Sequence, residues 1–151
     1  MPKFTEQKFV YTTYIRTTPE RLWLALTSPE FTRQYWFGID VVSDWKVGST
    51  MKYAKGSETL VLGKVLEAKP FTLLSYTFHE EKNEESSHEP PTKVTLEIEP
   101  EAGTETVRLI VTHSDFVENS KHFQNISGGW PAVLSGLKTF LETGKSLAFE
   151  V

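Results

Sequence analysis

The side chains of this sequence best suited to acid and base chemistry near neutral pH are its four histidines. One of them, His113, is followed directly by Ser114 and Asp115, which together are the three residue types of a hydrolytic triad. Neighbouring residues on a strand face opposite sides, so these three cannot act together without partners from elsewhere. His113 alone therefore remains a candidate base, and no triad is predicted.

His113 ends a segment in which every second residue is apolar, with Val107, Leu109 and Val111 before it. In a strand these residues share one face, so His113 faces whatever Leu109 and Val111 pack against. There it could orient a ligand carbonyl or phenol, or act as a general base. A structural histidine bonded to a backbone carbonyl is the more common case for a buried polar side chain. Both interpretations stay open.

Metal and phosphate sites are not indicated. His79, His88, His113 and His122 show no metal-ligand spacing, and a chain without cysteine has no thiolate nucleophile, disulfide or Cys-based zinc site. Gly128-Gly129 lacks the lysine and the longer glycine pattern of a phosphate loop, so we interpret it as a tight turn into a helix. Gly136 then either permits close approach to a strand or makes room for a ligand. We expect no cofactor.

Aromatic residues make up 13% of the chain and are its clearest indication of a ligand site. Each one separately is explained by ordinary core packing. Together, several indoles and phenols whose polar atoms need partners favour a polar-lined or water-containing cavity, and binding cavities are mostly apolar and aromatic. The predicted ligand contacts are Trp36, Trp45, Tyr53, Tyr76, Phe78, His113, Trp130, Leu134, Leu137 and Leu141.

Charge and hydropathy exclude several classes of partner. A net charge of -4 argues against the basic surface that nucleic-acid binding requires. The first residues contain no apolar signal core, and no stretch approaches the roughly 20 apolar residues of a membrane span. A length of 151 residues suits one domain, residues 1–151. We therefore expect a cytoplasmic, single-domain protein.

The elements that position the candidate residues begin with a strand and two helices. Residues 8–17 are rich in β-branched and aromatic side chains and predict a strand. Thr18-Pro19 and Ser28-Pro29 each place a capping residue before a proline at the first helical position. They predict one helix from 19 to about 26 and a second that ends near Gly38.

From residue 39 to 116 the hydrophobic period is two, which is typical of strands. Short turns separate the segments, so consecutive segments form an antiparallel meander. The highly charged residues 80–91 are interpreted as a solvated, mobile hairpin tip. The predicted strand segments lie around Val41 and at 51–55, 60–68, 72–79, 93–99 and 106–113.

The last predicted element is an amphipathic helix. After a polar connection that follows Phe116, apolar residues recur at helical spacing from Trp130 to Leu141, and Gly144 marks the end. A single helix that follows six or seven antiparallel strands must lay its apolar face on their sheet. The twist of the sheet then curves it around the helix. The predicted fold class is α+β.

Several segments in order along the chain resemble one protein family, the bacterial homologues of the heat-shock protein 90 ATPase activator. This family belongs to the START-like, or SRPBCC, superfamily. The resemblance implies a helix-grip fold, in which a curved antiparallel sheet wraps around a long C-terminal helix and a cavity lies between the two. The segments that carry it are 14–23 (YIRTTPERLW), 34–38 (QYWFG), 42–45 (VSDW) with Gly48, 111–113 (VTH) and 127–134 (SGGWPAVL).

Three functions are compatible with these observations. The first is binding, without catalysis, of a small hydrophobic molecule such as a lipid, a flavonoid or a polyketide-like compound; we favour it over an enzyme. The second is a protein-interaction module, such as a cofactor of a chaperone, that uses the exposed face of the sheet or residues 80–89. The third is a cyclase-like or hydrolase-like enzyme with His113 as the base.

Overall fold

The computed structural model of the chain describes residues 3–147. Strand β1 (Phe9–Arg16) comes first, followed by helices α1 (Pro19–Thr27) and α2 (Pro29–Tyr35). Thr18 caps α1, because its Oγ1 accepts a hydrogen bond of 3.1 Å from the backbone N–H of Arg21. Both helices begin with a proline at a position where no backbone N–H is needed, as the sequence predicts.

Seven strands form one antiparallel sheet in the order β1-β7-β6-β5-β4-β3-β2. Strands β2 to β7 each pair with their neighbour in sequence, as a meander requires, and β1 pairs with β7. The predicted α+β fold with a six- to seven-stranded sheet is therefore confirmed. The other strands are β2 (Asp40–Ser43), β3 (Thr50–Lys55), β4 (Glu58–Lys69), β5 (Leu73–Glu80), β6 (Thr92–Pro100) and β7 (Thr106–Ser114).

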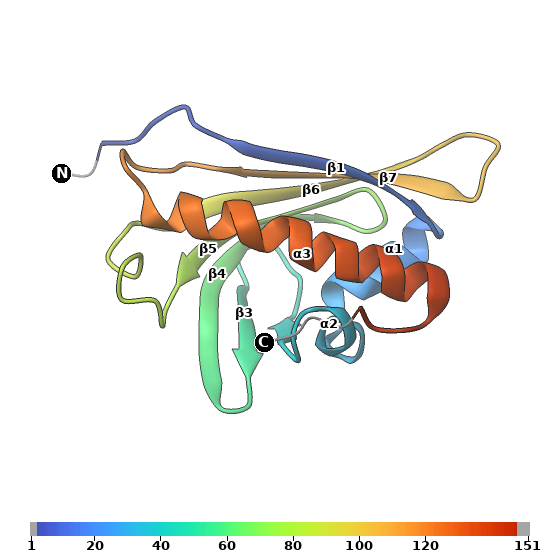
Figure 1. Cartoon of the computed structure of the whole chain (residues 1–151), viewed down its shortest axis with the longest axis horizontal. Coiled ribbons are helices and arrows are strands. Elements are labelled where there is room, and N and C mark those ends of the chain that lie inside the picture. The colour runs from blue at the N-terminus through green and yellow to red at the C-terminus, as the bar shows by residue number, and fades with distance from the viewer. Residues whose placement is uncertain (1–2, 148–151) are drawn as a thin grey trace.

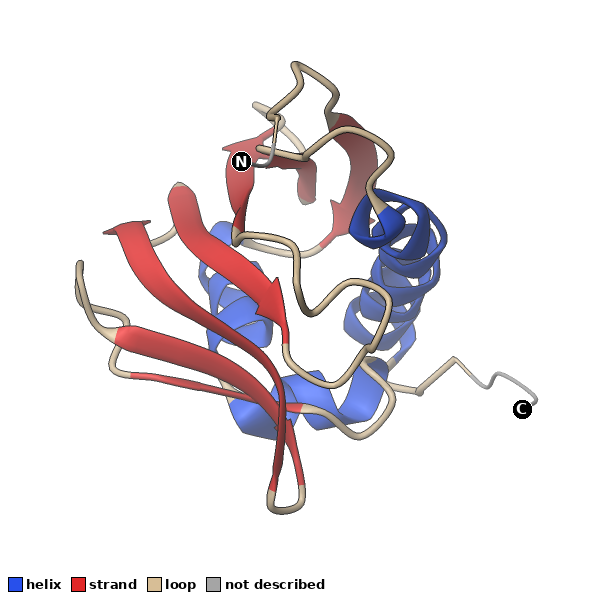
Figure 2. Ribbon diagram, turned by 90° about the vertical axis from the view of Figure 1, so that its left-hand side faces the viewer, coloured by secondary structure: helices blue, strands red, loops and turns tan. Residues whose placement is uncertain are grey.

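The sheet is strongly bent, and the helices lie on its concave side (Figure 2). In β4, Gly63 lies against the backbone of β5, where a Cβ atom would be 1.8 Å from the carbonyl oxygen of Thr77. Only glycine fits such a close approach between two strands. The approach lies next to an irregularity in the pairing of β4 with β5, which helps the sheet to curve.

Helix α3 (Lys121–Thr143) runs along the concave face of the sheet (Figure 1). It begins well before Trp130 and contains Gly128 and Gly129, so the predicted polar connection up to Trp130 and the tight turn at the glycines are wrong. The Oγ of Ser120 accepts a hydrogen bond of 2.9 Å from the N–H of Phe123 and caps the helix. Gly144 ends it in the left-handed conformation, as predicted.

Packing between α3 and its neighbours fixes the position of the helix. Trp130, Leu134 and Leu137 are buried against the sheet. Gly136 lies against α2, where a Cβ atom would be 2.8 Å from the carbonyl oxygen of Tyr35. The predicted close approach at Gly136 is present, but its neighbour is a helix and not a strand. Within residues 3–147 no helix has both the length and the apolar character needed to cross a membrane.

Candidate functional site

A pocket of about 430 Å³ lies between the N-terminal half of α3, the connection from α2 to β2, and strands β3 to β5. Residues of α3 that recur at helical spacing form one wall: Asn125, Ile126, Gly129, Trp130 and Val133. Aromatic residues from the sheet and from the end of α2 form the opposite walls: Trp36, Phe37, Tyr53 and Phe78. The rest of the lining is apolar Ile39, Leu60 and Val61 and polar Glu80, Lys82 and Asn83.

The aromatic side chains of the pocket pack against one another. The ring centroids of Trp36 and Tyr53 are 4.5 Å apart, and those of Trp36 and Trp130 are 5.5 Å apart. The hydroxyl of Tyr53 forms a hydrogen bond with that of Tyr76. Burial raises the pKa of both phenols well above the usual value, so both hydroxyls stay protonated and neither acts as a base.

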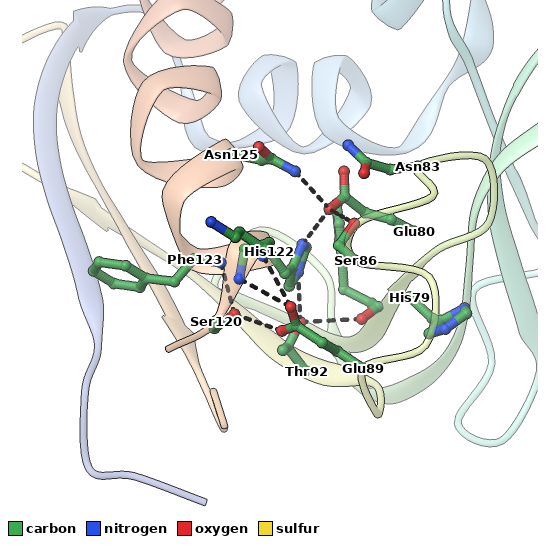
Figure 3. A network of polar contacts seen from close by, with 12 residues as sticks. His79, Glu80, Asn83, Ser86, Glu89, Thr92, Ser120, His122, Phe123 and Asn125 are labelled. Carbon is green, nitrogen blue, oxygen red and sulfur yellow. Dashed lines mark hydrogen bonds and ion pairs between the residues drawn. The ribbon is translucent and has the colours of Figure 1, made fainter. Parts of the chain in front are cut away.

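A chain of buried polar side chains runs behind the pocket. The indole N–H of Trp130 donates to Nδ1 of His113 at 3.0 Å. Nε2 of His113 lies 2.6 Å from Oγ1 of Thr92, which also lies 3.1 Å from Nε2 of His122. Nδ1 of His122 is 2.6 Å from Oε1 of Glu80, which lines the pocket (Figure 3). The chain therefore joins two walls of the pocket through the protein interior.

The donors in this chain assign the tautomer of His113. An indole N–H can only donate, so Nδ1 of His113 is an acceptor and the hydrogen of this neutral ring is on Nε2. The hydroxyl of Thr92 donates to the carbonyl of Phe78 at 3.0 Å, so it accepts from the Nε2–H group of His113.

The environment shifts the pKa values of His113 and Glu80 in the directions that this hydrogen-bond pattern requires. Burial, and secondarily the charge of His122, holds the pKa of His113 well below its usual value of 6.5. Burial alone would raise the pKa of Glu80, but hydrogen bonds from His122 and Ser86 outweigh it, and the pKa of Glu80 is lowered. The geometry and the pKa shifts both support a neutral His113 and an ionised Glu80.

The segment after β5 turns inward and holds the start of α3. Oε1 of Glu89 accepts from the hydroxyl of Ser120 at 2.6 Å, and its Oε2 accepts from the backbone N–H of Lys121 at 2.9 Å. Ser86 and Glu89 are 2% and 8% exposed. The prediction that residues 80–91 form a solvated hairpin tip is therefore wrong at these residues. A carboxylate at the N-terminus of a helix satisfies free N–H groups and complements the helix dipole.

The structure brings four of the predicted contact residues together in the pocket, namely Trp36, Tyr53, Phe78 and Trp130. Leu134 and Leu137 lie deeper with Tyr76, around a residual void of only about 10 Å³, so side chains fill the space beside the C-terminal half of α3. Leu141 lines neither the pocket nor this void. The pocket lies nearer the start of α3 than the sequence suggests.

Two other predicted residues have structural partners. The indole N–H of Trp45 donates to the carbonyl of Thr27 at 2.9 Å, outside the pocket. His113 faces α3 as predicted, and it is fully buried. Its partners are the side chains of Trp130 and Thr92 and not a backbone carbonyl. Because both ring nitrogens are engaged, His113 has no free position for a substrate.

Sequence reasoning missed Glu80, Thr92 and His122 as parts of the site. The first two flank the charged segment, and His122 follows a polar connection, so no hydrophobic pattern marks them. A histidine at the second position of a helix, after a serine cap, was the only local signal. Their contacts join positions 30 and 42 residues apart in the chain.

A curved antiparallel sheet around a long helix, with a pocket beside that helix, defines a helix-grip protein. Solved structures share this fold. The Aha1 dimer from Colwellia psychrerythraea is 22% identical over 93% of this chain and 99% of that chain, with a TM-score of 0.75. A Plasmodium falciparum Hsp90 activator is 18% identical over 89% of this chain and 95% of that chain, with a TM-score of 0.73.

A protein from Cytophaga hutchinsonii is 26% identical over 90% of this chain and 94% of that chain, with a TM-score of 0.68. Residues 16–142 match the family described as activator of Hsp90 ATPase homolog 1-like protein, and the chain belongs to this family. No curated protein matches the chain. The predicted resemblance to the activator family is thereby confirmed.

Proposed function

We propose that this protein binds a small, mainly apolar or aromatic molecule in the pocket beside α3, without catalysing a reaction. The pocket itself is the observation that carries the proposal. Its volume of about 430 Å³ lies in the range of small-molecule sites, roughly 300–1,000 Å³. Its walls are mostly aromatic and apolar with a few polar groups, which is the usual composition of such sites.

The surroundings of His113 favour binding over catalysis. A general base needs a nitrogen within hydrogen-bond reach of the substrate. Both nitrogens of His113 are bonded to buried side chains, and its ring has no exposed surface. The polar chain from His113 to Glu80 instead holds Trp130 and Glu80 in place as parts of the pocket wall.

Two adjacent glycines of α3 offer a matched pair of variants that tests the proposal. Gly129 lines the pocket and Gly128 does not, and a Cβ atom at either position meets nothing within 4 Å. We expect Gly129→Leu to fill the pocket and weaken ligand binding by about tenfold or more, which is ~1.4 kcal/mol. Gly128→Leu should leave binding unchanged. Both replacements favour the helix, so both variants should fold.

Binding is measured by amide and indole NMR shifts during titration with lipids, flavonoids and polyketide-like compounds. The indole N–H signals of Trp36 and Trp130 report on the pocket, and that of Trp45 is an internal reference because it lies outside. If no compound shifts the pocket signals, or if both leucine variants bind equally well, the proposal is wrong.

Membership in the activator family favours a second function, the stimulation of an Hsp90-type chaperone ATPase. The test is the rate of ATP hydrolysis by the chaperone with and without this protein. Stimulation that persists in Gly129→Leu would mean that the chaperone uses a surface other than the pocket. Stimulation without any pocket ligand would favour the second function over the first.

A further inference from the structure

Glu80 uses only one of its two carboxylate oxygens within the protein. Oε1 accepts hydrogen bonds from Ser86 Oγ at 2.8 Å, from His122 Nδ1 at 2.6 Å and, more weakly, from Asn125 Nδ2 at 3.5 Å. Oε2 receives no hydrogen bond from any residue in the described range 3–147. Figure 3 shows it on the side of Asn83, away from the dashed contacts.

This free oxygen belongs to the pocket. Glu80 lines it together with Trp36, Tyr53, Phe78 and Trp130, and its side chain is 20% exposed. Oε2 is not among the buried side-chain atoms that lack a partner, so it is open to solvent or to a ligand. A carboxylate oxygen without a protein partner can accept from a donor that a ligand brings, and it gains most from a charged one.

The aromatic rings favour the same kind of group. Their faces carry partial negative charge, and they attract a cation within about 6 Å of the ring centre. The centroid of Tyr53 lies 4.5 Å from that of Trp36 and 5.9 Å from that of Phe78, so one small group in the pocket can approach more than one ring. Rings and carboxylate together make the wall attractive to an organic cation.

We propose that the ligand of this pocket is an amine, with a protonated ammonium group on Glu80 Oε2 and an apolar or aromatic body against the aromatic wall of the pocket. The proposal rests on the pocket being a binding site, as proposed above. Lys82 is the cation of the pocket lining; it is exposed at the mouth, where its charge is screened by water. His122 lies on the other oxygen of Glu80 and leaves Oε2 free.

Three naphthalene probes of similar size separate charge from hydrogen bonding. 1-Naphthylmethylamine is a cation, 1-naphthylmethanol is a neutral donor, and 1-methylnaphthalene has no donor. Dissociation constants from calorimetry or NMR should rank the amine tightest, by about tenfold over methylnaphthalene and by several-fold over the alcohol. Equal binding of the amine and the alcohol would overturn the inference about the amine.

Two variants test whether the carboxylate of Glu80 causes the preference of the pocket for the amine. Glu80→Gln should reduce the advantage of the amine over 1-methylnaphthalene to less than about twofold, because the amide has no charge and places an NH2 donor where Oε2 lies. Asn83→Asp should increase the advantage of the amine, because it adds a negative charge to the pocket. Asn83 Oδ1 accepts from the N–H of Glu85 at 2.9 Å, a bond that aspartate preserves, so this variant should fold and remains decisive if Glu80→Gln does not.

The outcomes separate the two proposals. If 1-methylnaphthalene binds in the pocket and the amine has no advantage, the amine proposal is wrong and the binding function stands. An advantage that persists in Glu80→Gln, or that does not grow in Asn83→Asp, also overturns it. If none of the three probes shifts the pocket signals, this proposal and the binding function fail together.

Discussion

Acid should destabilise this protein through His113, and replacement of that residue isolates the effect. In the unfolded chain His113 takes up a proton as the pH falls below about 6.5, its usual pKa, whereas burial keeps it neutral in the folded protein. The unfolded state then binds more protons than the folded state. The contribution of His113 to the free energy of unfolding therefore decreases as the pH falls through 6.5 and levels off well above it.

The magnitude follows from one group that titrates only in the unfolded chain. Between pH 7.5 and pH 5.5 the proton uptake of His113 lowers the free energy of unfolding by about 1.4 kcal/mol. Glutamine at this position can still accept from Trp130 and donate to Thr92, the two hydrogen bonds that His113 makes. His113→Gln should therefore fold and lose this pH dependence, although it removes the ring that packs against Phe78 and Phe116.

The assay is urea unfolding of the wild type and His113→Gln at pH 7.5 and 5.5, followed by tryptophan fluorescence. The other histidines and the carboxylates contribute to both proteins, so only the difference between their pH dependences matters. We expect the wild type to lose about 1.4 kcal/mol more than the variant over this interval. If the two proteins lose equal stability, His113 is protonated in the folded protein and the assigned hydrogen-bond pattern is wrong.

Two further substitutions test how α3 is held. Gly136→Ala should destabilise the protein by about 1–3 kcal/mol in urea unfolding, because the new Cβ atom would lie 2.8 Å from the carbonyl oxygen of Tyr35. Gly128→Ala is the control: its Cβ atom meets open space, so it should stabilise the protein by about 0.5–1 kcal/mol. Glu89→Gln should cost about 1–2 kcal/mol, because Glu89 caps α3 as a buried carboxylate. Equal effects of the two glycine variants, or an effect of Glu89→Gln no larger than that of exposed Glu85→Gln, would contradict these contacts.

Local patterns were enough to predict the order and type of the elements. Alternation of apolar residues marks each strand of the meander within one or two residues, and a proline after a capping residue marks the start of α1 and of α2. The start of α3 could not be predicted in this way. Gly128, Gly129 and Pro131 oppose a helix by propensity, and tertiary packing together with the caps from Ser120 and Glu89 outweighs them.

The sequence predicted the types of residue that line the pocket better than it predicted the position of the pocket along α3. Trp36, Tyr53, Phe78 and Trp130 were expected at a ligand site because large aromatic side chains with polar atoms suit one. Composition does not say which apolar residues fill the interior completely, and the close packing of Leu134 and Leu137 depends on the approach of α3 to α2 at Gly136. Such packing is a property of the assembled layers and not of any one segment.

The charged segment after β5 links the pocket to the stability of α3. Its two ends serve different purposes: Glu80 forms part of the pocket wall, whereas Glu89 caps the helix. Both contact the first turn of α3, Glu80 through the side chain of His122 and Glu89 through backbone N–H groups. A ligand that binds only when this wall is formed must stabilise the wall by mass action. Hydrogen exchange at the first turn of α3 should therefore slow when the pocket is filled, in Gly128→Leu but not in Gly129→Leu.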